Sequence, residues 1–402
     1  MYPTSFPMRI KKIIGKLHLW LGLTSGLLVF VVAITGCLYA FQEEIQNLTQ
    51  AYRFVEPKDA VFLPPSELQD IAVKQLPNKH LHAILYGGKH QAAQAIFYHY
   101  EPTYYYITYL NPYSGEVLKV KNMDADFFRI VLNGHFYLWL PPTIGQPIVA
   151  SATLVFLFIV LSGLLLWWPK NRKVAPQRFS IKWGAKWRRK NYDLHNVLGF
   201  YSLVLALIFA LTGLVWGFQW FAKGYYTAFG GEKSLLYEEP ISDKKQKEVQ
   251  LATQAPAIDR VWKLMNEQHP EAKLIEVHIP ETDSSTISAN FNTREGRYWS
   301  TDYRYFDQYT LAEKSVRHLY GRLAQAKLAD KVMRMNYDIH VGAILGLPGK
   351  ILAFFASLII ASLPITGFMI WWGRRNKEKK KGKEQTVGNT ISSKQLKFTA
   401  KP

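Results

Sequence analysis

Residues 18–41 of this 402-residue chain read HLWLGLTSGLLVFVVAITGCLYAF. The stretch contains no Asp, Glu, Lys or Arg. It is long enough to cross a bilayer, because about 20 helical residues span the roughly 30 Å hydrocarbon core. Three later stretches are similarly apolar. The sequence therefore predicts four transmembrane helices, over residues 17–41, 144–168, 195–220 and 345–372.

The net charge of +19 is concentrated in three short segments. Residues 1–17, 169–194 and 373–402 together hold 23 Lys and Arg against 3 Asp and Glu, a balance of +20. By contrast, residues 42–134 hold 8 basic and 10 acidic residues, and residues 221–350 hold 18 and 17. The basic residues therefore lie beside the apolar stretches and not on the large polar segments.

The positive-inside rule predicts from this pattern a multi-pass membrane protein. The cytoplasmic parts would be the N-terminus (1–16), a basic loop (169–194) and a basic tail (373–402), and the segments 42–134 and 221–335 would be extracytoplasmic. Basic clusters next to a membrane helix are typical of contact with anionic headgroups. We therefore expect membrane lipid, and no nucleic acid, as a partner.

Cys37 is the only cysteine, so no intrachain disulfide can form. The apolar run that ends in Thr35, Gly36 and Cys37 also resembles a lipoprotein signal with its lipidated cysteine. However, the same pair of Ser or Thr followed by Gly recurs near the end of the other three apolar stretches, where no signal can be cleaved: Ser162-Gly163, Thr212-Gly213 and Thr366-Gly367. We interpret the pair as a helix feature and residues 17–41 as a retained anchor.

One histidine accompanies each predicted helix. His18 precedes Gly36 by the same 18 residues that separate His195 from Gly213. Each of these two histidines also has a glycine four residues later, which would open a notch one turn away on the same helix face: Gly22 and Gly199.

The other two helices match each other. His135 lies ten residues before Gly145, and His340 lies nine residues before Gly349. The chain therefore reads as two copies of one unit, in which an extracytoplasmic domain is enclosed by two histidine helices. Because the first and third helices would run in the same direction, an axis along the membrane normal would relate the copies.

The histidines are predicted to meet in two pairs, His18 with His195 at the cytoplasmic end and His135 with His340 at the outer end. Imidazole is a standard axial ligand of haem iron, and a flat macrocycle in a helix bundle requires small residues beside it. Zinc or copper is less favoured, because no Cys or carboxylate is placed to complete its coordination. The remaining alternative is interfacial histidine at headgroup depth.

Several basic side chains at the helix ends are candidates for binding haem propionates: Arg9, Lys12, Arg188, Arg189 and Arg334. His318, near the approach to the fourth helix, is a further candidate for contact with an outer cofactor.

The two extracytoplasmic segments are predicted to hold one helix and a small antiparallel sheet each. Alternating apolar residues predict strands, and a 3.6-residue period predicts helices. In the first segment these are a helix over 65–76 and strands over 82–85, 93–100, 104–110 and 117–120. In the second they are a helix over 257–267 and strands over 273–279, 286–292 and 297–305. The predicted fold class is thus an internally duplicated α+β membrane protein with a four-helix transmembrane bundle.

Three stretches carry a resemblance to a known family: HLWLGLTSGLLVFVVAITGCLYAF (18–41), YLNPYSGEVL (109–118) and DIHVGAILGLPGKILAFFASLIIASLPITGFMIWW (338–372). They resemble the PepSY-associated transmembrane family, sometimes described as iron-regulated membrane proteins. The resemblance covers nearly the whole chain apart from the basic tail. It implies two PepSY-like extracytoplasmic domains. One departure is the stretch LWLPPTIGQP (138–147), where the family more often has a smooth helical approach.

Within that family the architecture resembles the di-haem ferric-siderophore reductases. This resemblance implies two bis-histidine b-type haems, with His18 and His195 as ligands of one iron and His135 and His340 as ligands of the other. It also implies that the chain lies in the bacterial inner membrane with segments 42–134 and 221–335 in the periplasm. There it would reduce a ferric siderophore from Fe(III) to Fe(II), which releases the iron.

Two other functions are left open by the residues. One is a general membrane b-type cytochrome that serves a periplasmic protein acceptor. The other is a haem-free PepSY regulator of peptidases. No dinucleotide fingerprint is present, and the 26 residues between the second and third predicted helices are too few for a flavin domain. We therefore expect a quinol or a separate cytoplasmic reductase as electron donor.

Overall fold

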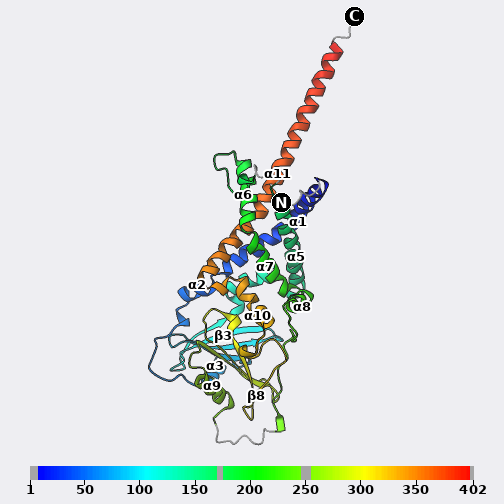
Figure 1. Ribbon diagram of the computed structural model, residues 1–402. Helices are drawn as coiled ribbons and strands as arrows, with labels where there is room; N and C mark the ends of the chain where they lie inside the picture. Colours follow the sequence, from blue (N-terminus) through cyan, green and yellow to red (C-terminus); the bar gives the residue numbers. More distant parts are fainter. Residues whose placement is uncertain (1–7, 170–174, 246–254, 399–402) are drawn as a thin grey trace.

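The computed structural model describes residues 8–169, 175–245 and 255–398, and side chains as far as residue 376. Residues 170–174 of the predicted basic loop and most side chains of the predicted basic tail lie outside this part. The molecule has a helix bundle with a β-sheet at one end (Figure 1). We call the two ends of the bundle sheet-proximal and sheet-distal.

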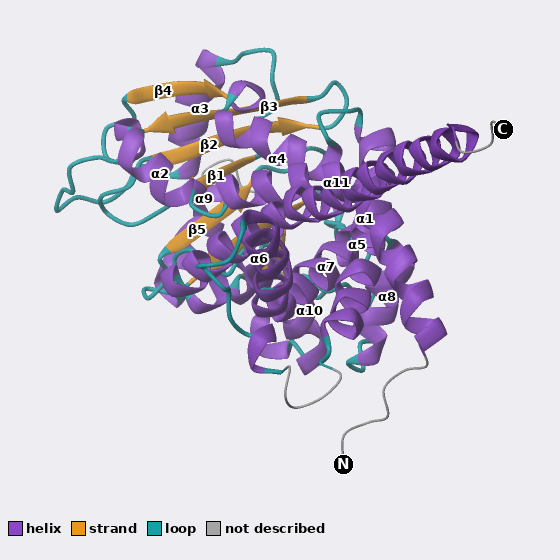
Figure 2. Cartoon of the chain, turned by 90° about the horizontal axis from the view of Figure 1, so that it is seen from above, coloured by secondary structure: helices purple, strands orange, loops and turns teal. Residues whose placement is uncertain are grey.

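The strands form one antiparallel eight-stranded sheet in the order β4-β3-β2-β1-β5-β6-β7-β8. Figure 2 shows β4 to β5 side by side in this order. The strands are β1 (Ala83–Tyr86), β2 (Ala93–His99), β3 (Tyr104–Leu110), β4 (Val117–Asn122), β5 (Leu274–His278), β6 (Thr286–Asn292), β7 (Asp302–Asp307) and β8 (Glu313–Lys314). The four strands of each polar segment therefore occupy one half of the sheet.

The two halves meet at β1 and β5, so the two small sheets predicted from the sequence are joined into one. Ile84 of β1 lies opposite Val277 of β5 in an antiparallel register. Both residues are completely buried. An unpaired β1 or β5 would present a free edge, and pairing the two edges satisfies the backbone groups of both.

Helices α3 (Pro65–Gln75) and α9 (Ala257–Gln268) cover the sheet face that is turned away from the bundle (Figure 1). Leu68 of α3 packs in a core with Phe97, and Met265 of α9 packs in a core with Ile287. The helices contact each other where Ser66 donates hydrogen bonds from its backbone and hydroxyl to Asp259, at 2.8 and 2.5 Å. The periodic apolar residues of both helices thus form the core beneath the sheet.

The predicted strands 104–110 and 286–292 are confirmed to the residue as β3 and β6. The predicted strand over 297–305 is wrong at its start, because residues Tyr298–Ser300 form a 3-10 turn and β7 begins at Asp302. The cause is the buried carboxylate of Asp338, which accepts hydrogen bonds from the backbone of Tyr298 and Trp299 at 3.2 and 2.8 Å. This contact comes from a helix distant in sequence.

Three helices are long and apolar enough to cross a membrane: α1 (Met8–Tyr39), α5 (Pro142–Trp167) and α11 (Leu347–Phe398), the last over Leu347–Asn376. α1 packs against both α5 and α11. Many large apolar side chains on these helices face outward, such as Leu27, which is 73% exposed, and Phe158, which is 55% exposed. Outward apolar side chains of this size are suited to contact with lipid.

The predicted helix over 195–220 is not one straight helix. It is formed by α6 (Trp187–Tyr201) and α7 (Leu203–Gly217), which are bent by 61° at Ser202 and together can make a fourth span. The hydroxyl of Ser202 donates to the carbonyl of Gly199 at 3.4 Å, and such bonds back to the preceding turn often bend helices. The bend lets α6 contact α11 while α7 contacts α5 and α10.

Two further helices, α4 (Phe127–Tyr137) and α10 (Leu328–His340), connect the sheet to α5 and α11. The carboxylate of Asp126 caps α4 by accepting from the backbone N–H groups of Phe128 and Arg129. After α4 the chain reverses tightly through Leu138 and Trp139, both with positive φ, and α5 begins at Pro142. The short helices α2 (Gln42–Thr49) and α8 (Gln219–Ala228) follow α1 and α7.

α10 is separated from α11 by a similar break. Gly342 and Gly346 both have positive φ, and an added Cβ at Gly342 would lie 2.3 Å from the carbonyl oxygen of Gly349. Only glycine permits this close approach of two backbone segments. The prolines of residues 138–147 therefore mark a helix break, and the fourth predicted helix has a matching break in front of it.

Candidate functional site

The four predicted histidines lie at two levels of the bundle. His18 is in the first half of α1, and His195 is on α6. Figure 1 shows the start of α1 and the whole of α6 at the sheet-distal end. His135 is near the end of α4, and His340 is the last residue of α10, both at the sheet-proximal end. Each outer histidine is therefore on a helix of its own and not on the long apolar helix that follows it.

Each histidine uses its Nδ1 atom to contact the hydroxyl of one of the four Ser/Thr-Gly pairs on a facing helix. The four contacts are His18 with Ser162 (2.9 Å), His135 with Thr35 (3.2 Å), His195 with Thr366 (2.9 Å) and His340 with Thr212 (2.8 Å). The recurrent pairs are therefore the partners of the histidines.

The tautomer of the four rings follows from these bonds. Each hydroxyl donates its hydrogen to a carbonyl of its own helix; Thr212, for example, donates to Ile208 at 2.5 Å. The hydroxyl oxygen must then accept from His Nδ1–H. His135 Nδ1 also lies 2.9 Å from the carbonyl oxygen of Val32, which can only accept. With the proton on Nδ1, the Nε2 atom carries the lone pair and is the ring atom suited to bind a metal.

In three of the four pairs the glycine provides the space in which the ring lies. A Cβ added to Gly36 would lie 3.1 Å from Cε1 of His135, and one added to Gly367 would lie 3.2 Å from Cε1 of His195. The corresponding distance at Gly163 to His18 is 3.3 Å. A larger residue here would therefore displace the ring that its neighbouring hydroxyl orients.

The outer histidines line a cavity between the helices. The cavity encloses about 1320 Å³, including the space at its open mouth. Small residues make up much of its wall: Ala33, Gly36, Ala150, Ala152, Ala210, Gly213, Gly217 and Ala353. The wall is therefore apolar and carries little side-chain bulk, which suits a flat and largely apolar group.

His135 and His340 are brought together across this cavity. Their ring centroids are 6.1 Å apart and their planes are inclined by 72°. Tyr337, one turn before His340, also lines the cavity. Burial raises the pKa of the Tyr337 phenol, so this side chain stays neutral and can act only through its dipole or hydrogen bonds.

His18 and His195 form the sheet-distal pair. His18 and His195 are near enough to interact electrostatically. Gly22 and Gly199 are open on the side where a side chain would project: an added Cβ at Gly22 meets nothing within 4 Å, and at Gly199 the nearest atom is 3.8 Å away, on Leu363. A methyl group at either glycine would therefore meet no close neighbour, and the notches beside His18 and His195 stay a prediction.

One sequence motif that is not among the predicted site residues occurs once at each histidine level. Residues 191–195 read NYDLH and residues 336–340 read NYDIH. In each case the Asn amide donates to the backbone carbonyl of the threonine that orients the histidine: Asn191 to Thr366 at 3.0 Å, and Asn336 to Thr212 at 3.1 Å. The aspartates of both motifs are buried as well. The repeated pentapeptide is thus a support for His195 and His340.

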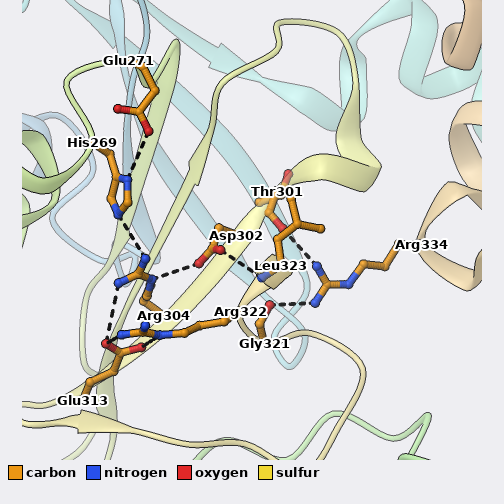
Figure 3. Close-up of polar contacts among 10 residues, drawn as sticks. All are labelled: His269, Glu271, Thr301, Asp302, Arg304, Glu313, Gly321, Arg322, Leu323 and Arg334. Atoms are coloured by element: carbon orange, nitrogen blue, oxygen red, sulfur yellow. Dashed lines mark hydrogen bonds and ion pairs between the residues drawn. The ribbon is translucent and has the colours of Figure 1, made fainter. Parts of the chain in front are cut away.

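Two predicted contacts with an outer cofactor do not fit the structure. Arg334 lies on α10, but its guanidinium donates to the carbonyls of Leu319, Gly321 and Thr301 at 2.7 to 3.2 Å and does not line the cavity. Figure 3 shows its contacts with Thr301 and Gly321. His318 is 2% exposed, stacks near Tyr237 and does not line the cavity. Both side chains therefore stabilise the loops beside the sheet. The sequence places Arg334 and His318 in or near α10, but the geometry of the loops does not support contact with a cofactor.

No preformed metal site of another kind is found in the described residues. No group of three His, Cys, Asp or Glu side chains there is arranged to hold a metal ion. Two other histidines meet at the junction of the sheet halves, where His278 Nδ1 lies 3.2 Å from His82 Nε2. This contact is in the sheet and not in the bundle.

A known protein family matches most of the chain. The family described as the PepSY-associated TM region matches residues 16–374. The chain belongs to this family. The match spans all four histidines, all four Ser/Thr-Gly pairs and both halves of the sheet, and it supports a multi-pass membrane protein. No curated protein matches the chain.

Proposed function

We propose that this member of the PepSY-associated TM family is a di-haem electron-transfer protein of the bacterial inner membrane that reduces ferric siderophores on the sheet side. The observation that carries the proposal is the 6.1 Å separation of the His135 and His340 rings across one cavity. At this separation His135 and His340 could both bind one iron atom through Nε2, because a metal–nitrogen bond is about 2 Å long.

The tautomers support the same proposal. All four Nδ1 atoms are held by hydroxyls, and no described residue forms a hydrogen bond with Nε2 of these rings. A metal-bound histidine normally donates its other ring N–H to an acceptor that fixes its orientation. His135 and His340 would hold the outer haem, and His18 and His195 the inner one. The haem groups would supply one-electron redox chemistry near each face of the membrane.

The chain's own residues would have three tasks. The Ser/Thr hydroxyls orient the ligands, the glycines leave room for the macrocycle, and the apolar walls of the cavity exclude water. Reduction of the iron in a siderophore to Fe(II) weakens its binding by hard oxygen ligands, so the organic ligand need not be cleaved. The nearly balanced charge of residues 42–134 and 221–350 suits both neutral and cationic chelates.

Visible spectroscopy of the purified protein tests the proposal. We expect two low-spin b-type haems per chain, with the signal of one lost or altered in His195→Ala and that of the other in His340→Ala. His99→Ala is the matched control, because His99 is in β2 and stacks on Tyr104. Absence of haem in the wild type would refute the proposal and favour a regulator of peptidases.

The acceptor is tested by mixing the reduced protein with ferric siderophores. Rapid reoxidation with formation of Fe(II) is the expected result. Reoxidation by a periplasmic protein but not by any ferric siderophore would instead indicate a general membrane cytochrome.

A further inference from the structure

A groove at the sheet-distal end of the bundle lies between α6 and the membrane-boundary part of α11. It encloses about 1210 Å³, including the space at its open mouth. Four aromatic side chains line it: Trp187 and Tyr192 from α6, and Phe368 and Trp372 from α11. Trp187 and Trp372 are 59% and 53% exposed, so a ligand can enter the groove from the surrounding lipid.

One buried polar group lines this groove. The side chain of Asn191 is 4% exposed, and its amide nitrogen donates to the carbonyl of Thr366 at 3.0 Å. A carbonyl can only accept, so the orientation of the amide is fixed and its oxygen is the free end. That oxygen is buried and has no hydrogen-bond partner among the described residues. A ligand in the groove that carries a hydroxyl donor would satisfy it.

The groove is adjacent to the inner histidine level. Asn191 and His195 are four residues apart on α6, and therefore share one helix face at neighbouring turns. Both also contact the same residue, because Thr366 accepts from Asn191 through its carbonyl and from His195 through its hydroxyl at 2.9 Å. A ligand bound to Asn191 would lie about one helical turn from His195, close enough for electron transfer.

We infer that this groove is the binding site of a membrane quinol, which acts as the electron donor. The inference rests on the proposed electron-transfer function. A quinol has a planar ring for the aromatic walls, a hydroxyl that donates to the Asn191 oxygen, and an apolar tail that leaves into lipid. A lipid phosphodiester is also attracted by Arg188 and Arg374 at the rim, but it offers no hydrogen to the amide oxygen.

The redox step balances without a further reactant. The quinol loses two electrons and two protons and becomes a quinone. The protons leave through the open mouth of the groove into water. The two electrons leave one at a time past His195 and reduce two ferric ions to two ferrous ions at the sheet-proximal end.

Asn336 provides a control within the same chain. Its amide nitrogen makes the equivalent bond to Thr212, and its amide oxygen is also buried without a partner in the described part of the chain. However, it lines neither this groove nor the outer cavity. If the motif only positions threonine and histidine, Asn191→Leu and Asn336→Leu will alter their nearest haem alike. If Asn191 binds quinol, only Asn191→Leu will impair the donor reaction.

The experiment uses the full chain in nanodiscs with decylubiquinol and, separately, a menaquinol analogue. Wild type should be reduced by at least one of them, and Asn191→Leu should lower the rate at least tenfold while dithionite still reduces all the haem. Asn196→Leu, on the same helix but bonded to Tyr192, should leave the rate unchanged. Equilibrium binding of the corresponding quinone, which needs no turnover, should weaken at least tenfold in Asn191→Leu alone.

Two outcomes would overturn the inference. One is a wild type that neither binds quinone nor is reduced by quinol, although its dithionite-reduced form still passes electrons to ferric siderophore; the proposed function would then survive with another donor. The other is equal loss in Asn191→Leu and Asn336→Leu, which would assign Asn191 a positioning role. Phe368→Ala guards against a folding artefact of Asn191→Leu, because it widens the groove without touching the Thr366 bond, and it should also weaken quinone binding.

Discussion

The hydroxyl oxygen of Thr212 on α7 lies 2.8 Å from Nδ1 of His340 on α10, and the same hydroxyl donates to Ile208 at 2.5 Å. This relationship fixes both the ring and its tautomer, because the oxygen can only accept from the histidine. The other three histidines have the same arrangement with a Ser or Thr of a facing helix. Ser and Thr hydroxyls thus hold all four imidazoles in the same tautomer.

Thr212→Val should weaken the outer site. Valine keeps the shape but leaves Nδ1–H of His340 without its acceptor, and loss of such an orienting partner typically costs about 10–100-fold in metal affinity. We expect lower haem occupancy and a shifted reduction potential for one haem only, measured by haem titration and redox potentiometry. Thr153→Val is the control, since Thr153 lines the same cavity but bonds only to Val149 of its own helix. Equal effects of both substitutions would contradict an orienting role for Thr212.

Gly36→Ala should disturb the outer site through space alone. The added Cβ would lie 3.1 Å from Cε1 of His135, and that ring cannot withdraw freely because Val32 and Thr35 hold its Nδ1 atom. Low-spin haem signals in electron paramagnetic resonance should change for one haem. In Gly224→Ala, on α8, the new methyl group meets nothing within 4 Å, so the spectrum should stay as in the wild type. An unchanged spectrum in Gly36→Ala would show that the ring can adjust.

The sequence predicts elements whose pattern is local. The strands 104–110 and 286–292 follow from alternation alone, and the apolar stretches follow from composition. Elements that depend on distant contacts are not predictable in this way. The turn at Tyr298 exists because Asp338 accepts its backbone N–H, and the joining of β1 to β5 depends on a pairing between segments about 190 residues apart.

The candidate site is predictable to a similar extent. The histidines and the Ser/Thr-Gly pairs stand out in the sequence, but the 18-residue spacing within each helix hides the fact that each pair serves a histidine of another helix. His18, for instance, bonds to Ser162 and not to a residue near Gly36. The signal that could have revealed more was the repeated pentapeptide NYDLH and NYDIH, since identical spacing of Asn and His in both motifs indicates a common contact.

Arg334→Lys should destabilise the sheet-proximal loops. The guanidinium binds three carbonyls at once, on Thr301, Leu319 and Gly321, of which Figure 3 shows the first and the last. A lysine ammonium cannot reproduce this planar set of donors, and leaving buried carbonyls unpaired should cost about 2–3 kcal/mol. Thermal unfolding of the full chain measures the loss. Arg322→Lys is the control, because its ion pair with Glu313 is 42% exposed on the arginine side and should contribute under about 1 kcal/mol.

Asp307 should make the stability of the sheet depend on acidic pH. Burial by itself would raise its pKa, but backbone N–H groups of Asp243, Thr310 and Tyr309 together with Lys314 lower the pKa to about 2. A carboxyl group with a depressed pKa in the folded state stabilises the fold above its unfolded pKa of about 3.9, and this contribution is lost as the pH falls from about 4 to 2. The shift corresponds to roughly 2 kcal/mol.

Asp307→Asn should therefore reduce the free energy of unfolding by roughly that amount at pH 7. The difference between wild type and variant should shrink steadily below pH 4, because the wild-type carboxylate is then also neutralised. Unfolding followed by tryptophan fluorescence from pH 7 to pH 2 measures both effects. Asp59→Asn, at an exposed position, should leave the curve unchanged. A constant difference at all pH values would mean that the shape of the Asp307 side chain, and not its charge, stabilises the turn between β7 and β8.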